Sequence, residues 1–211
     1  MTYDFAGSWD DVSGHQANVF KSQDHPEATP FDIDSTVQYY TGQGVAHRKI
    51  VLGMPLYGRA FLDTDGPGTS FNGVGPGSWE EGVFDAKVSC YKPHTYQTNA
   101  KMQALPQEGA QEYYDANAIA SWSYDRSTRK MISYDSPRTV DAKVEYLKGS
   151  GLGGAMWWET SGDRSVNGSD GKSLIHLAVE NLRSDGLEAQ ENWLGYSASQ
   201  YDNLKRGMPG E

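Results

Sequence analysis

The chain has 211 residues, which is enough for one large domain or two small ones. Its formal net charge of −10 disfavours a nucleic-acid partner or an anionic membrane surface, and it has no run of about 18 apolar residues that would span a membrane. Aromatic side chains are abundant, with 13 Tyr and 6 Trp, and such rings suit stacking on sugar faces as well as filling cores.

Cysteine and histidine point to no special chemistry. The single cysteine, Cys90, excludes an internal disulfide, so cysteine usage says nothing about redox compartment. The histidines lack metal-ligand spacing, so we predict neither a metal site nor a cofactor. They are His15, His25, His47, His94 and His176. The first residues have neither the basic nor the long apolar region of a secretory signal peptide, and the sequon at 167–169 matters only for a secreted protein.

The first third of the chain predicts a strand, a loop, a helix and a second strand. Met1–Phe5 has the pattern of a buried strand, and a domain that begins in such a pattern resembles a cut one. Residues 12–34 are polar and read as a long loop. Ser35 is expected to cap a helix that runs to about Gly42. With the strand that follows, this is a βαβ unit.

The stretch from Lys49 to Phe61 contains the second strand and a candidate site. The apolar run Ile50–Leu52 closes at glycine and proline, as expected for a parallel strand buried on both faces. Tyr57 and Arg59 follow directly, and α/β folds place their sites at the carboxyl ends of parallel strands. The alternative interpretation is a buried tyrosine and a surface arginine at the exit of a strand.

The segment between Phe61 and Tyr134 has a different pattern. Glycine and proline punctuate its first part, and three short antiparallel strands are predicted after it, at 112–115, 119–125 and 130–134. Residues 126–129 make the turn between the last two strands. We therefore expect a small α+β subdomain inserted between a strand and the helix that follows it.

The last third predicts a helix, a strand and a helix. Ser136 is a suitable N-cap, Pro137 fits the first helical position, and apolar residues recur on one helix face. Residues 152–159 predict another buried strand, with two tryptophans at its carboxyl end. A final helix is expected over 173–182, followed by a polar tail from 184.

Four motifs in this order resemble the chitinases of glycoside hydrolase family 18, in the branch with an α+β insertion. They are Met1–Asp4 with Gly7–Trp9, Gly53–Phe61, Ala120–Tyr124 with Ile132–Tyr134, and Gly153–Trp158. The resemblance implies an α/β fold, a partial (β/α)8 TIM barrel containing strands six to eight. Its parts would be barrel residues 1–56, an insertion at 57–134, barrel residues 135–183 and a tail at 184–211. It also implies chitin or chito-oligosaccharides as the ligand and an extracellular location.

The resemblance assigns the amino-terminal residues to the reacting sugar. Family chemistry is retaining and substrate-assisted: the acetamido oxygen attacks its own anomeric carbon while a glutamic acid protonates the leaving oxygen. Tyr3 would orient the acetamido group, an arrangement in which small displacements are costly. Asp4 would bind sugar hydroxyls beside it, and Met1 would line the base of the pocket.

Four further residues would bind the sugar chain by the same resemblance. Trp158 would form the floor under the sugar at the cleavage point. Tyr57 and Arg59 would hydrogen-bond the chain from the side of the insertion, and Trp9 would stack on the far side of the cleft.

The chain departs from the family in lacking the catalytic acid. The motif Asp-x-x-Asp-x-Asp-x-Glu does not occur in the sequence. We expect Glu159 to face structure or solvent and not to replace this motif. Trp157 reads as a core residue because neighbouring strand residues face opposite ways. We therefore expect the carboxyl-terminal portion of a chitinase, without hydrolytic activity by itself.

Residues 88–103 are a second departure. Deleting these sixteen residues joins Phe84-Asp-Ala-Lys directly to Ala-Leu-Pro, which matches the family better. The first two of the sixteen residues, Val-Ser, can be encoded by an intron donor sequence, and the last, Gln, can be encoded by an acceptor sequence. We hypothesise a translated intron. The alternative is a genuine surface loop, although long unstructured loops inside compact domains are uncommon.

Two other function classes remain open. A chitin-binding, lectin-like protein would use the same aromatic residues without the acid, and the catalytic glutamate of the full gene discriminates it from an enzyme. A scaffold or interaction module would fit exposed strand edges but would explain none of the four motifs.

Overall fold

The computed structural model describes residues 1–74, 109–164, 166, 173–183, 187–188 and 195–206. The chain divides into two compact units, Met1–Asn181 and Leu182–Glu211, which are described separately. The possible intron at 88–103 and the sequon at 167–169 lie outside the described residues. Within the described part, no helix is both long and apolar enough to cross a bilayer.

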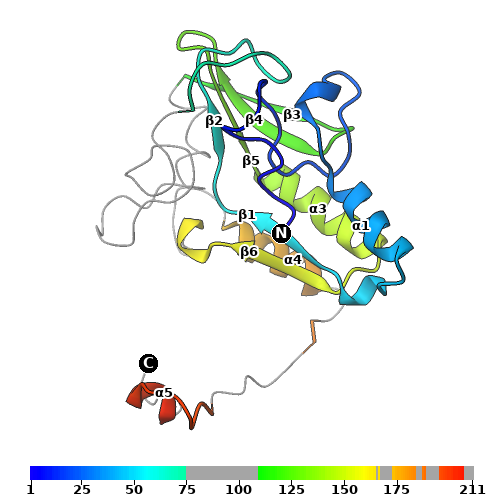
Figure 1. The fold of residues 1–211 in the computed structure, drawn as a ribbon, viewed down its shortest axis with the longest axis vertical. Coiled ribbons are helices and arrows are strands. Elements are labelled where there is room, and N and C mark those ends of the chain that lie inside the picture. The colour runs from blue at the N-terminus through cyan, green and yellow to red at the C-terminus, as the bar shows by residue number, and fades with distance from the viewer. Residues whose placement is uncertain (75–108, 165, 167–172, 184–186, 189–194, 207–211) are drawn as a thin grey trace. The chain divides into compact units, whose positions relative to one another are not determined.

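The first unit contains a four-stranded antiparallel sheet, in the order β2-β5-β4-β3 (Figure 1). Its strands are β2 (Arg59–Phe61), β3 (Gln111–Asp115), β4 (Ala120–Asp125) and β5 (Lys130–Tyr134). The three predicted strands β3, β4 and β5 are confirmed, as is the turn at 126–129. Strand β2 was not predicted, because three residues are too few to reveal an alternating pattern.

The second sheet is a parallel pair, β1 (Val51–Pro55) and β6 (Gly154–Trp158), in which Gly53 lies opposite Met156. Residues 52–55 of β1 are buried, as predicted for a strand covered on both faces, but Val51 of the predicted apolar run is 52% exposed, so the prediction is wrong at the start of the strand. Strand β6 is partly exposed along its length, and Trp158 is 51% exposed. The prediction of a buried strand there is wrong, because its glycine-rich and aromatic sequence lies at a surface.

Helix α1 (Ile33–Gly42) and helix α3 (Pro137–Gly149) are both capped by side chains. Ser136 caps α3 as predicted, and its hydroxyl accepts from the Thr139 amide. The predicted cap of α1 is wrong: Asp32, three residues before Ser35, accepts from the Ser35 amide at 2.6 Å. A carboxylate in the first turn also interacts favourably with the helix dipole.

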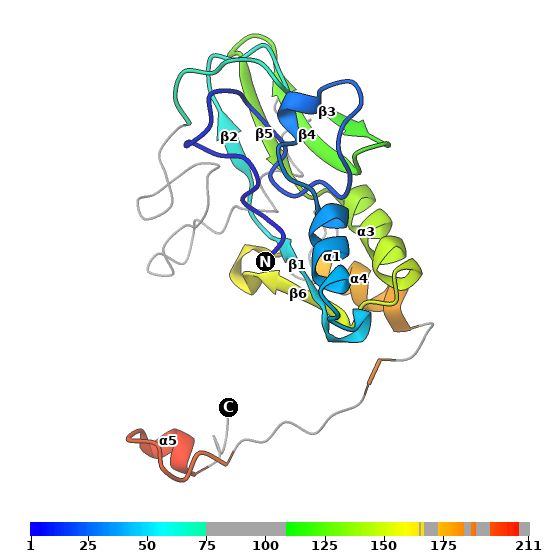
Figure 2. The same ribbon diagram turned by 45° about the vertical axis from the view of Figure 1, so that its right-hand side comes forward.

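The helices pack beside one another, as Figures 1 and 2 show. The Tyr146 hydroxyl of α3 donates to Asp34 of α1 at 3.0 Å. Helix α4 (Leu174–Arg183) contacts α3 through Asn181, whose amide donates to Asp141 at 2.6 Å. The predicted final helix is thus confirmed.

The amino-terminal segment runs beside β1 without forming a strand (Figure 1). The Thr2 hydroxyl donates to the Gly53 carbonyl at 2.6 Å, which joins the segment to β1. The predicted strand Met1–Phe5 is wrong, because Asp4 has a φ of 61°, in the left-handed region that interrupts extended backbone. This turn directs the Asp4 side chain toward the residues that follow β1.

Candidate functional site

The candidate site is built around the carboxylate of Asp4. Its Oδ1 accepts from the Tyr57 hydroxyl at 2.6 Å and from Arg59 Nε and Nη2 at 3.0 and 2.9 Å. Tyr57 and Arg59 lie just beyond the carboxyl end of β1, and Asp4 comes from the amino-terminal segment. The structure therefore brings Asp4 together with two predicted site residues, Tyr57 and Arg59, that are 53 and 55 positions away in sequence.

Burial strengthens this polar cluster. Tyr57 is buried, which raises the pKa of its phenol, and the hydrogen bond to the Asp4 carboxylate raises it further. The phenol therefore stays protonated and donates. The Arg59 side chain is only 12% exposed and Asp4 is 36% exposed. Tyr57 is thus the buried tyrosine of the alternative interpretation, but Arg59 is not a surface arginine, because a carboxylate holds it inside.

Trp9 extends the cluster through the Arg59 guanidinium. The guanidinium carbon lies 5.4 Å from the centroids of both the Trp9 and the Tyr57 rings, within the range of cation–π attraction. The Trp9 ring lies against Gly7, where an added Cβ would come within 2.5 Å of the indole. Glycine at this position thus permits the indole to lie on the backbone while 58% of Trp9 stays exposed.

Tyr3 packs edge-to-face on Tyr57, with ring centroids 6.0 Å apart. Its hydroxyl is buried and has no hydrogen-bond partner within the described part of the chain. Burial raises the pKa of Tyr3, with a further contribution from the nearby Asp4 carboxylate. An uncharged phenol without an acceptor is suited to donate to a ligand.

Trp158 lies on the same face of the parallel pair as Tyr3. A Cβ added to Gly53 would meet Tyr3 Cε1 at 3.2 Å and Met156 Cε at 3.4 Å, so the phenol lies over the Gly53–Met156 pair. Trp158 is two positions beyond Met156 and shares its face, because strand residues alternate. The same added Cβ would lie 3.0 Å from the Met1 Cα, and Met1 is 85% exposed.

The antiparallel sheet supports the cluster through a row that the sequence did not reveal. Arg59, Ser133, Trp122 and Tyr113 lie opposite one another across β2, β5, β4 and β3. Trp122 stacks on Tyr113 at 5.4 Å, and the buried His15 ring lies 5.0 Å from Trp122. Burial lowers the pKa of His15 to about 4, so this ring is neutral near pH 7.

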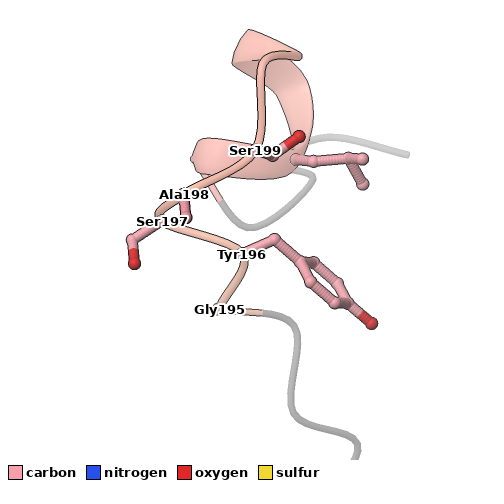
Figure 3. Close-up of a pocket in the computed structure, with 6 residues that line it drawn as sticks. Gly195, Tyr196, Ser197, Ala198 and Ser199 are labelled. Carbon is pink, nitrogen blue, oxygen red and sulfur yellow. The ribbon is translucent and has the colours of Figure 1, made fainter.

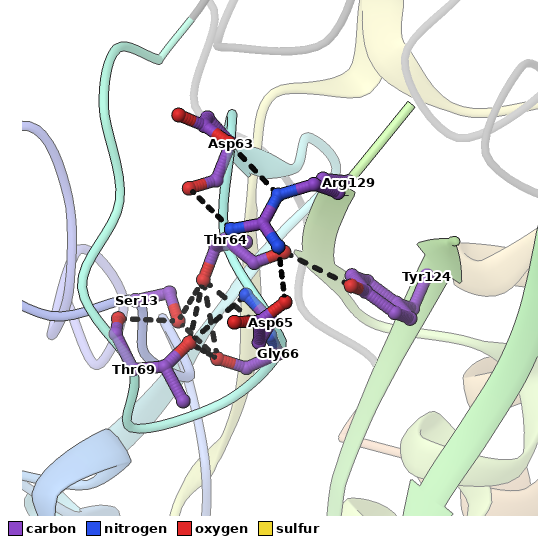
Figure 4. Close-up of polar contacts among 8 residues, drawn as sticks. All are labelled: Ser13, Asp63, Thr64, Asp65, Gly66, Thr69, Tyr124 and Arg129. Carbon is purple, nitrogen blue, oxygen red and sulfur yellow. Dashed lines mark hydrogen bonds and ion pairs between the residues drawn. The ribbon is translucent and has the colours of Figure 1, made fainter. Parts of the chain in front are cut away.

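A second polar network holds the loop that follows β2 (Figure 4). Arg129, in the turn between β4 and β5, donates to Asp63 at 2.8 Å and to Asp65 at 2.5 Å. Behind this pair the Thr64 hydroxyl donates to Ser13 at 3.2 Å. The loop begins where β2 ends, so the network lies next to the strand that carries Arg59, but the side chains of its Arg129 ion pairs are exposed.

The pocket drawn in Figure 3 belongs to the second unit and contains none of the predicted site residues. It has a volume of ≈ 350 Å³ and is lined by Gly195–Ser199 together with Leu204 at helix α5 (Asp202–Lys205). None of these described lining residues is an acid, a base or a histidine. Among the described residues, no group of three His, Cys, Asp or Glu side chains is arranged to hold a metal ion.

Comparison with known proteins identifies relatives of the whole chain. Residues 1–163 match the family described as "Glycosyl hydrolases family 18". The chain is 45% identical over 208 residues to "Chitinase 1" of Aphanocladium album and 44% identical to "Endochitinase 1" of Metarhizium robertsii. Each alignment covers 99% of this chain but only 44% of the relative, so the chain spans less than half of their length.

Solved structures agree with these sequence matches. "Chitinase ChiA74 from Bacillus thuringiensis" superimposes with a TM-score of 0.69 at 30% identity, over 90% of this chain and 32% of the other. A GH18 chitinase from Cycas revoluta in complex with (GlcNAc)3 gives a TM-score of 0.66 at 26% identity. That match covers 86% of this chain and 45% of the plant protein.

Proposed function

The chain belongs to glycosyl hydrolase family 18, and from this premise we propose that it forms the substrate-binding side of a chitinase cleft. The ligand would be a β-1,4-linked N-acetylglucosamine chain, and the whole protein would hydrolyse it outside the cell. The observation that carries the proposal is the convergence of Tyr3, Asp4, Tyr57 and Arg59 at the end of β1. A related chitinase is known in complex with (GlcNAc)3, which supports the choice of ligand.

The fold of the whole protein would be a (β/α)8 barrel with an α+β insertion. Strands β1 and β6 would be its strands seven and eight, consistent with their parallel pairing. The antiparallel sheet β2-β5-β4-β3 would belong to the insertion at 57–134. Residues 1–56 and 135–183 would form the barrel part, and 184–211 a polar tail.

Tyr3 and Asp4 would act on the reacting sugar. The Tyr3 hydroxyl is buried and lacks an acceptor in the described residues, so an acetamido oxygen would complete its hydrogen bonding. Asp4 is fixed by Tyr57 and Arg59 and is still 36% exposed, which leaves its carboxylate within reach of sugar hydroxyls. Holding both groups in place before the substrate arrives favours substrate-assisted attack.

The aromatic residues would supply flat surfaces for the sugar rings. Trp158 and Trp9 are 51% and 58% exposed, so both rings are accessible to a ligand. Trp158 would form the floor below the cleaved sugar, with Met1 at the base of the pocket. Tyr57 and Arg59 would line the insertion side, and Trp9 would stack farther along the chain.

The catalytic step would need a proton donor that these residues do not supply. The sequence lacks the Asp-x-x-Asp-x-Asp-x-Glu motif of the family. Tyr3 cannot replace it, because burial raises its pKa further above the range of an acid that donates its proton near pH 7. We therefore propose that this chain alone binds chito-oligosaccharides but does not cleave them.

Isothermal titration of the purified chain tests this proposal. The N-acetylglucosamine tetramer should bind, whereas cellotetraose, which lacks the acetamido groups, should not. Incubation with the tetramer should release no shorter sugars. Absence of tetramer binding, equal binding of cellotetraose or measurable turnover would each contradict the proposal.

A chitin-binding, lectin-like protein is the second candidate. It would bind the sugar through the same cluster around Asp4. The complete coding sequence decides between the two, because an enzyme requires the glutamate of that motif.

A further inference from the structure

Gln16 is a buried glutamine that joins the two chain segments carrying the polar cluster to the neighbouring strand β5. It is 1% exposed. Its side-chain Nε2 donates to the Tyr57 carbonyl at 2.6 Å and to the Ser133 carbonyl at 3.3 Å. Its main-chain amide donates to the Ser133 hydroxyl at 3.0 Å, and its carbonyl accepts from the Phe5 amide at 3.0 Å.

Each of these contacts is made to a residue of the cluster, to its neighbour in the chain or to its partner on the adjacent strand. Phe5 follows Asp4 directly, so the hydrogen bond to Phe5 holds the backbone on which the carboxylate is mounted. Tyr57 is held at its own carbonyl. Ser133 of β5 lies opposite Arg59 of β2, so the contacts to Ser133 hold the strand that pairs with the one carrying the guanidinium.

The hydrogen-bonding pattern requires a side chain with an N–H donor at this position. Only a side chain with an N–H donor can satisfy the Tyr57 and Ser133 carbonyls together, and a buried carboxylate in the same place would repel both. Loss of the donor leaves these buried carbonyls without this partner, which is unfavourable. The geometry therefore couples the position of Gln16 to the distances within the cluster.

We propose that Gln16 is a positioning residue for the sugar site: its amide fixes Asp4, Tyr57 and Arg59 relative to one another without touching the sugar. The inference rests on the proposed function for its effect on sugar binding. Its effect on the Asp4–Arg59 contact is independent of any ligand.

Asn18 provides a matched control from the same loop. It is also fully buried, and its Nδ2 donates to two carbonyls, those of Phe20 at 2.8 Å and Phe31 at 2.9 Å. Neither carbonyl belongs to a residue of the cluster. Replacing Asn18 therefore removes equivalent hydrogen bonds while leaving the contacts of Gln16 in place.

The experiment compares the wild-type chain with Gln16→Met and Asn18→Leu, which replace each amide by an apolar group of similar size. The ¹H–¹⁵N signal of Arg59 Nε reports its hydrogen bond to Asp4. Titration calorimetry with the N-acetylglucosamine tetramer gives affinity, and thermal unfolding gives stability. Gln16→Asn, whose shortened amide cannot reach the Tyr57 carbonyl, is the milder variant that decides the question should Gln16→Met not fold.

We expect both apolar variants to be less stable than the wild type. Only Gln16→Met should shift the Arg59 signal and lower the affinity for the tetramer about tenfold, equivalent to about 1.4 kcal/mol. An unchanged Arg59 signal in the Gln16 variants, or an equal shift in Asn18→Leu, would overturn the proposal. If the wild-type chain binds no tetramer, the proposed function fails while the Arg59 signal still tests the role of Gln16.

Discussion

The buried ion pair between Lys143 and Asp135 gives the largest predicted effect on stability. Lys143 Nζ lies 2.7 and 2.6 Å from the two carboxylate oxygens of Asp135, and the side chains are 0% and 3% exposed. Asp135 follows β5 and Lys143 belongs to α3, so the pair joins the antiparallel sheet to the helix. Lys143→Met leaves the carboxylate buried without this partner, which costs about 3–5 kcal/mol. That is a large part of a typical stability of about 5–15 kcal/mol.

The loss of stability caused by Lys143→Met should depend on pH and on whether Asp135 is also replaced. Burial raises the pKa of Asp135, and Lys143 opposes that rise. Without Lys143 the folded carboxyl binds a proton more readily than the unfolded one, whose pKa is about 3.9. The destabilisation relative to the wild type should therefore be largest near neutral pH and shrink as the pH falls toward that value. The double variant Asp135→Leu/Lys143→Met removes both charges and should recover most of the lost stability.

Urea unfolding of the wild type and these variants, at neutral and at mildly acidic pH, measures the effect. Lys148→Met is the control in the same helix. Lys148 lies 3.7 Å from Glu145, whose side chain is 74% exposed, so losing this pair should change the free energy of unfolding little. The reasoning is refuted if Lys143→Met costs less than about 1 kcal/mol, or if the double variant is no more stable than the single one.

Three further predictions concern the supports of the site. Burial lowers the pKa of His15 to about 4, against about 6.5 in the unfolded chain, so its contribution to stability is complete above pH 6.5. About 3 kcal/mol of the free energy of unfolding should be lost as the pH falls from 6.5 to 4. His15→Phe should flatten that part of the pH profile of stability measured with urea, and an unaltered slope would contradict the assignment. Ser136→Ala removes the cap of α3 and should cost about 1–2 kcal/mol by thermal unfolding, whereas no loss would mean that the cap is dispensable. Arg129→Met should leave the unfolding midpoint at physiological salt unchanged, because its partners are exposed; a clear decrease would show that the loop after β2 depends on this pair.

The elements that local signals determine were predicted well. Ser136 followed by proline specified the start of α3, and the turn at 126–129 specified the pairing of β4 with β5. One error arose where tertiary contacts decide: Met1–Phe5 lies along β1 yet turns at Asp4. The other error was local: Asp32 and Ser35 are both suitable N-caps, and Asp32, three residues earlier, is the one that caps α1.

The residues of the site could be predicted from the sequence, but the contacts between them could not. Resemblance to a family singled out Tyr3, Asp4, Tyr57 and Arg59, but no local pattern reveals that one oxygen of Asp4 accepts from both Tyr57 and Arg59. Gln16 escaped notice because its contacts reach 41 and 117 positions away, to Tyr57 and Ser133. A buried amide inside a loop is recognisable only once the fold is known.

Binding-site mapping by ¹H–¹⁵N spectroscopy tests the central claim most directly. When the N-acetylglucosamine tetramer is added to the labelled chain, we predict that the indole signals of Trp9 and Trp158 and the guanidinium signal of Arg59 shift together. Unchanged signals at these three side chains, with shifts confined to a separate surface such as the exposed Tyr39 and Tyr40 of α1, would contradict the account.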